Sequence, residues 1–98
     1  MKVHFNTDDL AMLESDRDFT GGFAPSVVKG FRKVMQFIRA AVDERDFYQM
    51  RSLRFEKLSG PRKHQRSMRI NDQYRLIMEL EGEGQAKTVK VMAIEDYH

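Results

Sequence analysis

The sequence has no cysteine, and this absence excludes disulfide bonds and metal sites built from thiolates. No apolar run approaches the roughly 18 residues that a membrane span needs, and Met1-Lys2 leads into polar residues instead of a signal-peptide core. The three histidines, His4, His64 and His98, are too far apart to suggest a zinc motif. We therefore expect a soluble, cytoplasmic protein that makes no membrane contact.

Glycine and proline are few and stand singly, with no low-complexity segment between them. The chain has 98 residues, of which 41% are hydrophobic and 33% charged, a composition typical of a globular protein. A second hydrophobic core would have too few residues to fill it. The sequence thus predicts a single domain over residues 1–98.

Positive charge is concentrated in one part of the chain. Residues 51–75 contain eight lysines and arginines against two acidic residues, a surplus of six, whereas the whole chain carries a net charge of only +2. The flanking segments are weakly acidic. Such a bounded basic block, with more arginine than lysine, favours a single phosphate-binding surface over general binding to polyelectrolytes.

At the start of the chain, apolar and polar residues alternate over a few positions. After that, apolar residues recur at helical spacing. Residues 2–6 predict a short strand with His4 facing solvent, and Thr7 is placed to cap a helix over residues 8–14 that buries Leu10, Met12 and Leu13. After a loop over residues 16–24, Pro25 begins the longest helix. Its expected buried stripe consists of Val27, Val28, Phe31, Val34, Met35, Ile38, Ala41 and Val42.

The opposite face of this helix carries four basic residues, which predict a solvated surface or, as the alternative, a contact with a partner or the ribosome. These residues are Lys29, Arg32, Lys33 and Arg39. Asp43 is a candidate cap for one more short turn. In that turn Phe47, Tyr48 and Met50 are expected to close over the core.

From Arg54 onward the pattern changes to that of strands. Strands are expected around residues 55–58 and 68–70, and Asn71-Asp72 predicts a tight turn, since both residues tolerate positive φ and bond locally to the backbone. Alternation over residues 74–80 predicts a third strand, and the apolar run within 87–96 indicates burial on both faces or a bulge. The order predicts an α+β fold, with an N-terminal strand and helices packed on one face of a twisted, mostly antiparallel sheet. The other face is left for function.

The segment RFEKLSGPRKHQRSMRINDQYRL, together with the terminal DYH, resembles the HigB-type toxins (plasmid maintenance killer proteins) of the RelE/ParE superfamily. The match is detailed over the second half of the chain. The resemblance implies a RelE-like small domain that acts as a ribosome-dependent endoribonuclease on translated mRNA, uses no metal or cofactor, and is neutralised by a HigA-like helix-turn-helix antitoxin. Operator DNA would be contacted only through that antitoxin.

Such a reaction needs a base for the RNA 2′-hydroxyl, cations for the charge on phosphorus, and an acid for the departing oxygen. The expected catalytic residues are Arg69, Arg75, Asp96, Tyr97 and His98. Glu56 is either a base or a structural partner of Arg54 or Arg75. The expected RNA-binding residues are Arg54, Lys57, Arg62, Lys63, His64 and Arg66.

Several positions depart from the family pattern or allow another interpretation. Some relatives have histidine at the position of Glu56 and lysine at that of Ser59, while the usual glycine is replaced by His64. Asn71 and Asp72 are interpreted as residues that form the turn. Tyr74 is explained equally well as a plain core residue and as a residue of the site. The alternative functions are a noncatalytic basic module that binds nucleic-acid complexes and a ParE-like toxin that inhibits gyrase.

Overall fold

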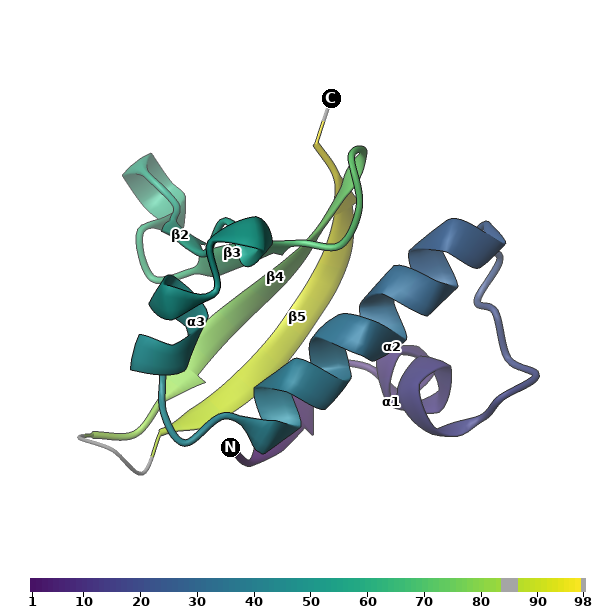
Figure 1. Ribbon diagram of the computed structural model, residues 1–98, viewed down its shortest axis with the longest axis horizontal. Coiled ribbons are helices and arrows are strands. Elements are labelled where there is room, and N and C mark those ends of the chain that lie inside the picture. Colours follow the sequence, from purple (N-terminus) through teal and green to yellow (C-terminus); the bar gives the residue numbers. More distant parts are fainter. Residues whose placement is uncertain (84–86, 98) are drawn as a thin grey trace.

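The computed structural model describes residues 1–83 and 87–97, which form an α+β fold (Figure 1). The fold also contains two short 3-10 helices, which we call η1 and η2. In chain order the elements are β1 (Val3–Phe5), α1 (Asp8–Ser15), α2 (Pro25–Ala40), α3 (Arg45–Gln49), η1 (Arg51–Leu53), β2 (Glu56–Lys57), η2 (Gly60–Arg62), β3 (Arg66–Arg69), β4 (Tyr74–Glu81) and β5 (Thr88–Asp96). The predicted order of helices and strands is confirmed.

The five strands form one mixed sheet in the order β1-β5-β4-β3-β2. Only β1 and β5 pair in parallel, and the other neighbours are antiparallel. Opposite β4, Ile77 pairs with Ala93 and Met78 with Val91, so Met92 is an extra residue in β5. The bulge predicted for this apolar run is therefore present, and it changes which side chains of β5 face the helices.

The first two helices begin where the sequence predicts. Thr7 caps α1, since its hydroxyl oxygen accepts the backbone N–H of Leu10 at 3.3 Å. Pro25 occupies the first turn of α2. The burial expected for Met12 is wrong, because that side chain is 40% exposed on the outer face of α1.

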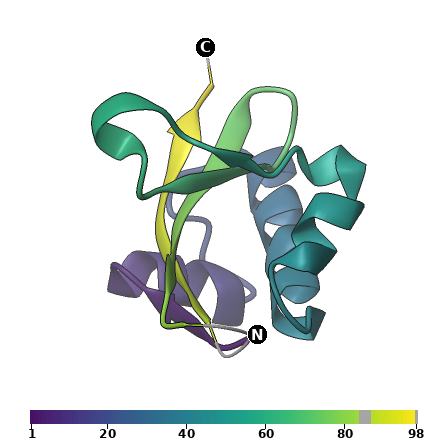
Figure 2. The same cartoon turned by 90° about the vertical axis from the view of Figure 1, so that its left-hand side faces the viewer.

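The core lies between the helices and one face of the sheet (Figure 2). From α2 it takes Val27, Val28, Phe31, Val34, Met35 and Ile38, and from β4 and β5 it takes Leu76, Met78, Val89 and Val91. The helix ends at Ala40, and Ala41 is extended, so the helical period stops before Val42. Val42 is consequently 76% exposed, against the sequence prediction.

The segment after α2 differs most from expectation. Phe47 is fully buried, as predicted, but Tyr48 is 57% exposed and Met50 is 44% exposed. Helix α3 has only five residues and passes at Met50 into η1, so a single turn faces the core. The predictions that Tyr48 and Met50 close over the core are wrong for this reason.

The basic face of α2 is only partly a solvated surface. Lys29 and Lys33 are exposed, whereas the Arg32 guanidinium donates hydrogen bonds to four backbone carbonyls of residues 13–19. Arg39 forms an ion pair with Glu14 of α1 at 2.6 Å. Two of the four basic residues therefore fasten α1 and its following loop to α2.

The face of the sheet away from α2 and α3 is partly covered by the excursion from β2 through η2 to β3 (Figure 2). Leu58 N–H donates to the Gln65 carbonyl, which closes this excursion at its base. Ile77 is 3% exposed on this face although it lies outside the main core cluster. No helix in the described ranges is long and apolar enough to cross a membrane.

Candidate functional site

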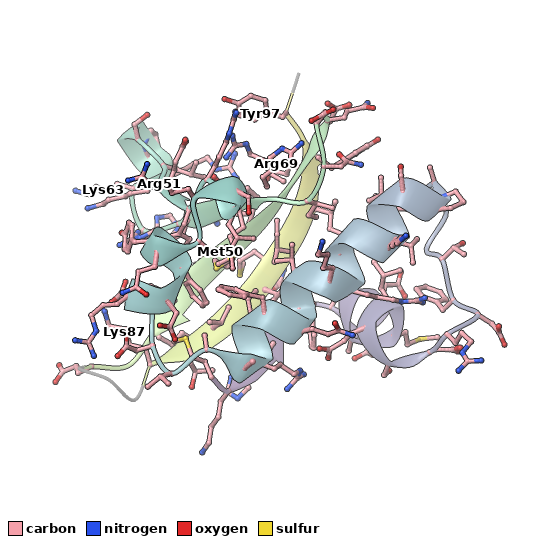
Figure 3. The ribbon with its side chains drawn as sticks, in the orientation of Figure 1. Met50, Arg51, Lys63, Arg69, Lys87 and Tyr97 are labelled. Carbon is pink, nitrogen blue, oxygen red and sulfur yellow. The ribbon has the colours of Figure 1, made fainter. Side chains whose placement is uncertain are left out.

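Four separate segments meet at the end of the sheet where β5 finishes. Arg54 follows η1, Arg69 ends β3, Arg75 lies in β4, and Tyr97 follows β5. Together with the β3–β4 loop they line a hollow of about 110 Å³, which we call the cleft. Arg69 and Tyr97 lie at the same end of the molecule as the C-terminus (Figure 3).

Strand register explains this convergence. Arg69 pairs with Arg75 across β3 and β4, and Arg75 pairs with Glu95 across β4 and β5. Paired residues project to the same face of a sheet, so these side chains form one row. The register therefore brings Arg75 to the same end of the sheet as the last residues of β5.

Arg75 is the most enclosed cation of the cleft, with 6% of its surface exposed. Its Nη1 donates to the Ser67 hydroxyl oxygen at 3.3 Å and to the Arg54 carbonyl at 3.4 Å. The ring of Tyr97 covers the guanidinium, with 4.1 Å between the guanidinium carbon and the ring centroid. Arg75 is therefore held in one position, and Tyr97 lies between it and solvent.

Glu56 lies next to Arg75, on the same face of the sheet. Its carboxylate Oε2 is 3.9 Å from Arg75 Nη1, which is a loose ion pair, and its side chain is 57% exposed. Glu56 also lines a second hollow of about 250 Å³ next to the cleft, with which it shares Arg75 and Tyr97. The carboxylate is thus within reach of a molecule in either hollow.

Arg54 is the only non-glycine residue in the described ranges with positive φ, at 48°. This left-handed conformation ends η1 and turns the Arg54 carbonyl toward Arg75 Nη1. Left-handed backbone at a non-glycine residue costs free energy and is retained where the surroundings hold it. Here the hydrogen bond from Arg75 is one such contact, so the cleft and the start of β2 are coupled.

Arg69 is more accessible than Arg75, with 35% of its side chain exposed. Its Nη2 donates to the carboxylate of Asp72 in the loop that joins β3 to β4. Asn71 builds this loop, because its side-chain oxygen accepts the N–H groups of Gln73 and Tyr74. Asn71 and Asp72 are turn residues as predicted, and neither of them has positive φ.

The last residues of β5 face different ways. Asp96 pairs with Tyr74, which packs against the core and Phe23, whereas Tyr97 covers Arg75. The Asp96 carboxylate accepts a hydrogen bond from the Gln73 side-chain amide at 3.0 Å, and Asp96 also lines the larger hollow. Asp96 and Tyr97 therefore border the site from different sides, and His98 lies outside the described residues.

Apart from Arg54, the residues expected to bind RNA lie in the segment from β2 to β3, which we call the rim, and Arg62 is the one of them that lines the larger hollow. Lys57 on β2 and Lys63 after η2 are exposed. His64 Nε2 lies 3.6 Å from a carboxylate oxygen of Glu79, and Arg66 Nη1 donates to the carbonyls of Lys63 and Gln65. By strand register Lys57 and Arg66 lie in the row of Met78, which faces the core, so the cations of the rim are divided between the two faces of the sheet.

Arg62 differs from the other residues of the rim because its donors are occupied. Its two terminal nitrogens bond to the two carboxylate oxygens of Glu95, at 3.0 and 2.8 Å, and its Nε donates to Gln65. This bidentate pair connects η2 to β5 across the larger hollow. It fixes the position of the basic loop over the sheet.

Sequence reasoning missed two residues of the site, Ser67 and Glu95. Ser67 is 1% exposed and accepts a hydrogen bond from Arg75, while Glu95 holds Arg62. Strand alternation contained the signal, since Ser67 is two residues from Arg69 and Glu95 two residues from Tyr97. In residues 1–83 and 87–97, no group of three or more histidine, aspartate or glutamate side chains is placed to hold a metal ion.

The chain is thus a small α+β fold with a cluster of arginines where its last strand ends. A family model described as the RelE-like toxin of type II toxin–antitoxin system HigB matches residues 3–98, and the chain belongs to this HigB-like toxin family. It is accordingly a toxin of the RelE-like superfamily, and a type II system implies a cognate antitoxin as partner.

Solved structures support the fold. The chain is similar to the YoeB/ParE toxin from Agrobacterium tumefaciens, with a TM-score of 0.58, 15% identity and complete coverage of both chains. It is also similar to the conserved hypothetical protein HP0894 from Helicobacter pylori, with a TM-score of 0.55 and 15% identity over 99% of this chain and 94% of that one. No curated protein matches the sequence.

Proposed function

We propose that this toxin is a ribosome-dependent endoribonuclease that cleaves translated mRNA in the cytoplasm, with residues 1–98 acting as one domain. The observation that supports the proposal is the convergence of Arg54, Arg69, Arg75 and Tyr97 on one small cleft. Clustered guanidinium groups suit a phosphate that gains negative charge during a reaction. The HigA-like helix-turn-helix antitoxin would neutralise the toxin and would itself carry the contacts with operator DNA.

The proposed reaction is an attack of the RNA 2′-oxygen on the adjacent phosphorus. The new 2′-O–P bond forms as the P–O5′ bond breaks, leaving a 2′,3′-cyclic phosphate and a 5′-hydroxyl. A base removes the 2′-hydroxyl proton, and an acid gives a proton to the 5′-oxygen. In this scheme the accessible Arg69 contacts the phosphate oxygens and stabilises their charge.

Arg75 and Tyr97 act as a unit in this scheme. The buried guanidinium holds the Tyr97 ring by a cation–π contact, and the outer side of the ring is exposed to solvent. An RNA base that stacks on this ring would gain about 1–3 kcal/mol. Arg75 then contributes its positive charge from beneath the ring while Tyr97 orients the nucleotide.

Three residues are the candidates for proton transfer, namely Glu56, Asp96 and His98. Glu56 and Asp96 both line the larger hollow, and the Glu56 carboxylate lies 3.9 Å from Arg75, which lines the cleft as well. We propose to separate them with Glu56→Gln, Asp96→Asn and a deletion of His98, each assayed for cleavage rate against pH. Replacing the residue that acts as base should remove one limb of the pH–rate profile of cleavage. Full activity after deletion of His98 would exclude His98 from the mechanism.

RNA outside the cleft is proposed to follow the rim that contains Lys57, Lys63, His64 and Arg66. Contacts of this kind with the phosphate backbone weaken steeply as salt concentration rises. Arg62 is proposed to contribute mainly by holding the loop in place, because Glu95 occupies its guanidinium. Arg62→Ala should accordingly alter rim geometry as well as charge.

The deciding experiment is induction of the toxin in cells that carry two versions of one message, one translated and one with its start codon removed. Primer extension should show cuts in the translated version alone. Equal cutting of both versions would contradict ribosome dependence. Growth arrest with intact messages would contradict the nuclease, and a loss of DNA supercoiling in those cells would favour the gyrase-inhibiting alternative.

A further inference from the structure

A second depression lies on the helical side of the molecule, between α2 and the segment that joins α3 to η1. It consists of two hollows, of about 240 and 390 Å³, that share Phe37 and Met50. Met50 lies in the space between α3 and α2 (Figure 3). We call this continuous depression the α2 groove.

The α2 groove is apolar at its centre and open to solvent. Met50 is 44% exposed although it is flanked by the buried Phe47 and Leu53. It stands between two short helices, with φ −87° and ψ 86°, so its side chain is directed into the groove instead of the core. An exposed methionine in a groove is an adaptable apolar contact for another protein.

Close packing fixes the shape of the groove at the end near the cleft. A β-carbon placed on Gly30 would lie 2.7 Å from the Ile70 carbonyl oxygen, so α2 touches the end of β3 with no room for a side chain. Both residues line the larger hollow. The groove is therefore a preformed surface on the toxin.

Charge indicates the chemistry of its occupant. The charged residues that line the larger hollow are Lys33 and Arg69, and both are basic. The smaller hollow is lined by Asp46, whose carboxylate accepts the Val42 N–H. Lys33 is exposed on α2. An apolar segment with a nearby carboxylate would match Met50 and Phe37 together with these two cations.

The position of Arg69 connects this groove to the cleft. Arg69 lines the larger hollow of the groove and also the cleft, where it bonds to Asp72. A carboxylate that approached along the groove would compete with Asp72 and draw the Arg69 guanidinium away from the cleft. Occupation of the groove would thereby weaken phosphate binding without blocking the cleft itself.

We infer that the α2 groove is a docking surface for an apolar, acid-bearing segment of the cognate antitoxin. The family supplies a protein partner, the groove supplies an apolar surface with two cations, and Arg69 supplies continuity with the cleft. Docking in the groove does not require the toxin to be a nuclease. Only the withdrawal of Arg69 from RNA rests on the proposed function.

The test compares Met50→Gln with Met12→Gln in the full-length toxin, by calorimetric titration with the cognate antitoxin. The two methionines are matched, since Met12 is 40% exposed on α1 and Met50 is 44% exposed in the groove. Met50→Gln should weaken binding about tenfold, and Met12→Gln should leave it within about twofold. Equal affinities for both variants and the wild type would overturn the inference.

Charge reversal supplies a second, independent measurement. Lys33→Glu should weaken antitoxin binding about tenfold, whereas Lys2→Glu, an exposed lysine next to β1, should not. Retained affinity in Lys33→Glu would contradict the acidic nature of the segment. Because the substituted side chains are exposed, thermal unfolding of each variant should match the wild type and show that the loss is one of binding.

Two further outcomes are distinguishable. Should the toxin fail to cleave translated mRNA while Met50→Gln still loses the antitoxin, the nuclease is wrong and the docking surface stands. Should the isolated wild type sediment as a dimer that Met50→Gln dissociates, the groove is a contact between two copies of the chain, and the antitoxin assignment is overturned.

Discussion

The two ends of the molecule differ in how their charged groups are paired. The N-terminus lies at the end of the molecule away from the cleft (Figure 1). At that end charged groups are paired at short range. Asp43 bonds to Arg45 at 2.8 Å, Glu44 pairs with Lys87, and the Met1 ammonium group donates to three carbonyls where α2 ends. A cation is favourable at a helix C-terminus, so the Met1 ammonium group stabilises the end of α2. The charged groups at this end therefore have their partners within the chain.

At the other end, three arginines line one cleft, and among the described residues Asp72, bonded to Arg69, is their one close acidic partner. Arg54, Arg69 and Arg75 line one cleft, where the nearest Glu56 oxygen lies 3.9 Å from Arg75. Arg75 is shielded by the Tyr97 ring more than by an acid. The contrast indicates that the paired end serves the stability of the fold, while the cleft end keeps positive potential available for an anionic ligand.

The largest effect is expected for Arg75→Ala, which breaks the cleft end in two ways. The substitution leaves the Ser67 hydroxyl and the Arg54 carbonyl without their buried donor, which should cost about 2–3 kcal/mol of unfolding free energy. It also removes a cation from the cleft, so cleavage should slow ~100-fold. Urea denaturation and single-turnover cleavage measure the two losses, and wild-type values in both would refute the role assigned to Arg75.

Arg69→Ala separates the two losses. Its ion pair with Asp72 is at the surface, so unfolding free energy should fall by less than about 1 kcal/mol. Cleavage should still slow ~100-fold, because Arg69 is the accessible cation of the cleft. Asp72→Asn is the matched control that removes the same ion pair and keeps the cation. A variant that unfolds early but cleaves normally would make Arg69 a structural residue.

Gly30→Ala tests whether packing, instead of ion pairs, holds the cleft end in place. Alanine favours a helix by ~1 kcal/mol over glycine, but its β-carbon would meet the Ile70 backbone at 2.7 Å. Overpacking of about 1–3 kcal/mol should win, so the urea midpoint should fall. Lys29→Ala, one residue away and exposed, is the control. A higher midpoint for Gly30→Ala would show that α2 moves away from β3 freely.

The predictable part of the structure is the part that depends on neighbouring residues. Thr7 and Pro25 predict where helices start, because a hydroxyl caps a helix and proline suits a first turn. The continuous apolar run in β5 indicated its bulge. The order of the last two strands along the chain also predicts that Arg75 lies near the end of β5, and Arg75 pairs with Glu95 there. These features follow from local geometry, which the sequence specifies directly.

The parts that sequence reasoning missed depend on contacts between distant segments. Arg62 and Glu95 are 33 residues apart, and no local pattern announces that they pair. Arg32 fastens a loop whose path is set by the packing of α1. Met50 is exposed because α3 stops after five residues, and hydrophobicity alone does not reveal where a short helix ends.

The smallest effect is expected at the paired end, for Asp43→Asn. Hydrogen bonds from the Arg45 side chain, and then from its backbone N–H, hold the pKa of Asp43 below its ordinary value of 3.8. A carboxyl whose pKa is lower in the folded chain stabilises it above the unfolded pKa, and this contribution disappears as pH falls through the folded pKa. The melting temperature of Asp43→Asn should therefore lie below that of the wild type at pH 7, and the gap should narrow below about pH 4.

Asp18→Asn is the control, because Asp18 is an exposed carboxylate in the α1–α2 loop, and its gap to the wild type at pH 7 should be smaller. A gap for Asp43→Asn that stays constant from pH 7 to pH 3 would mean that packing, and not the charge of Asp43, stabilises this end.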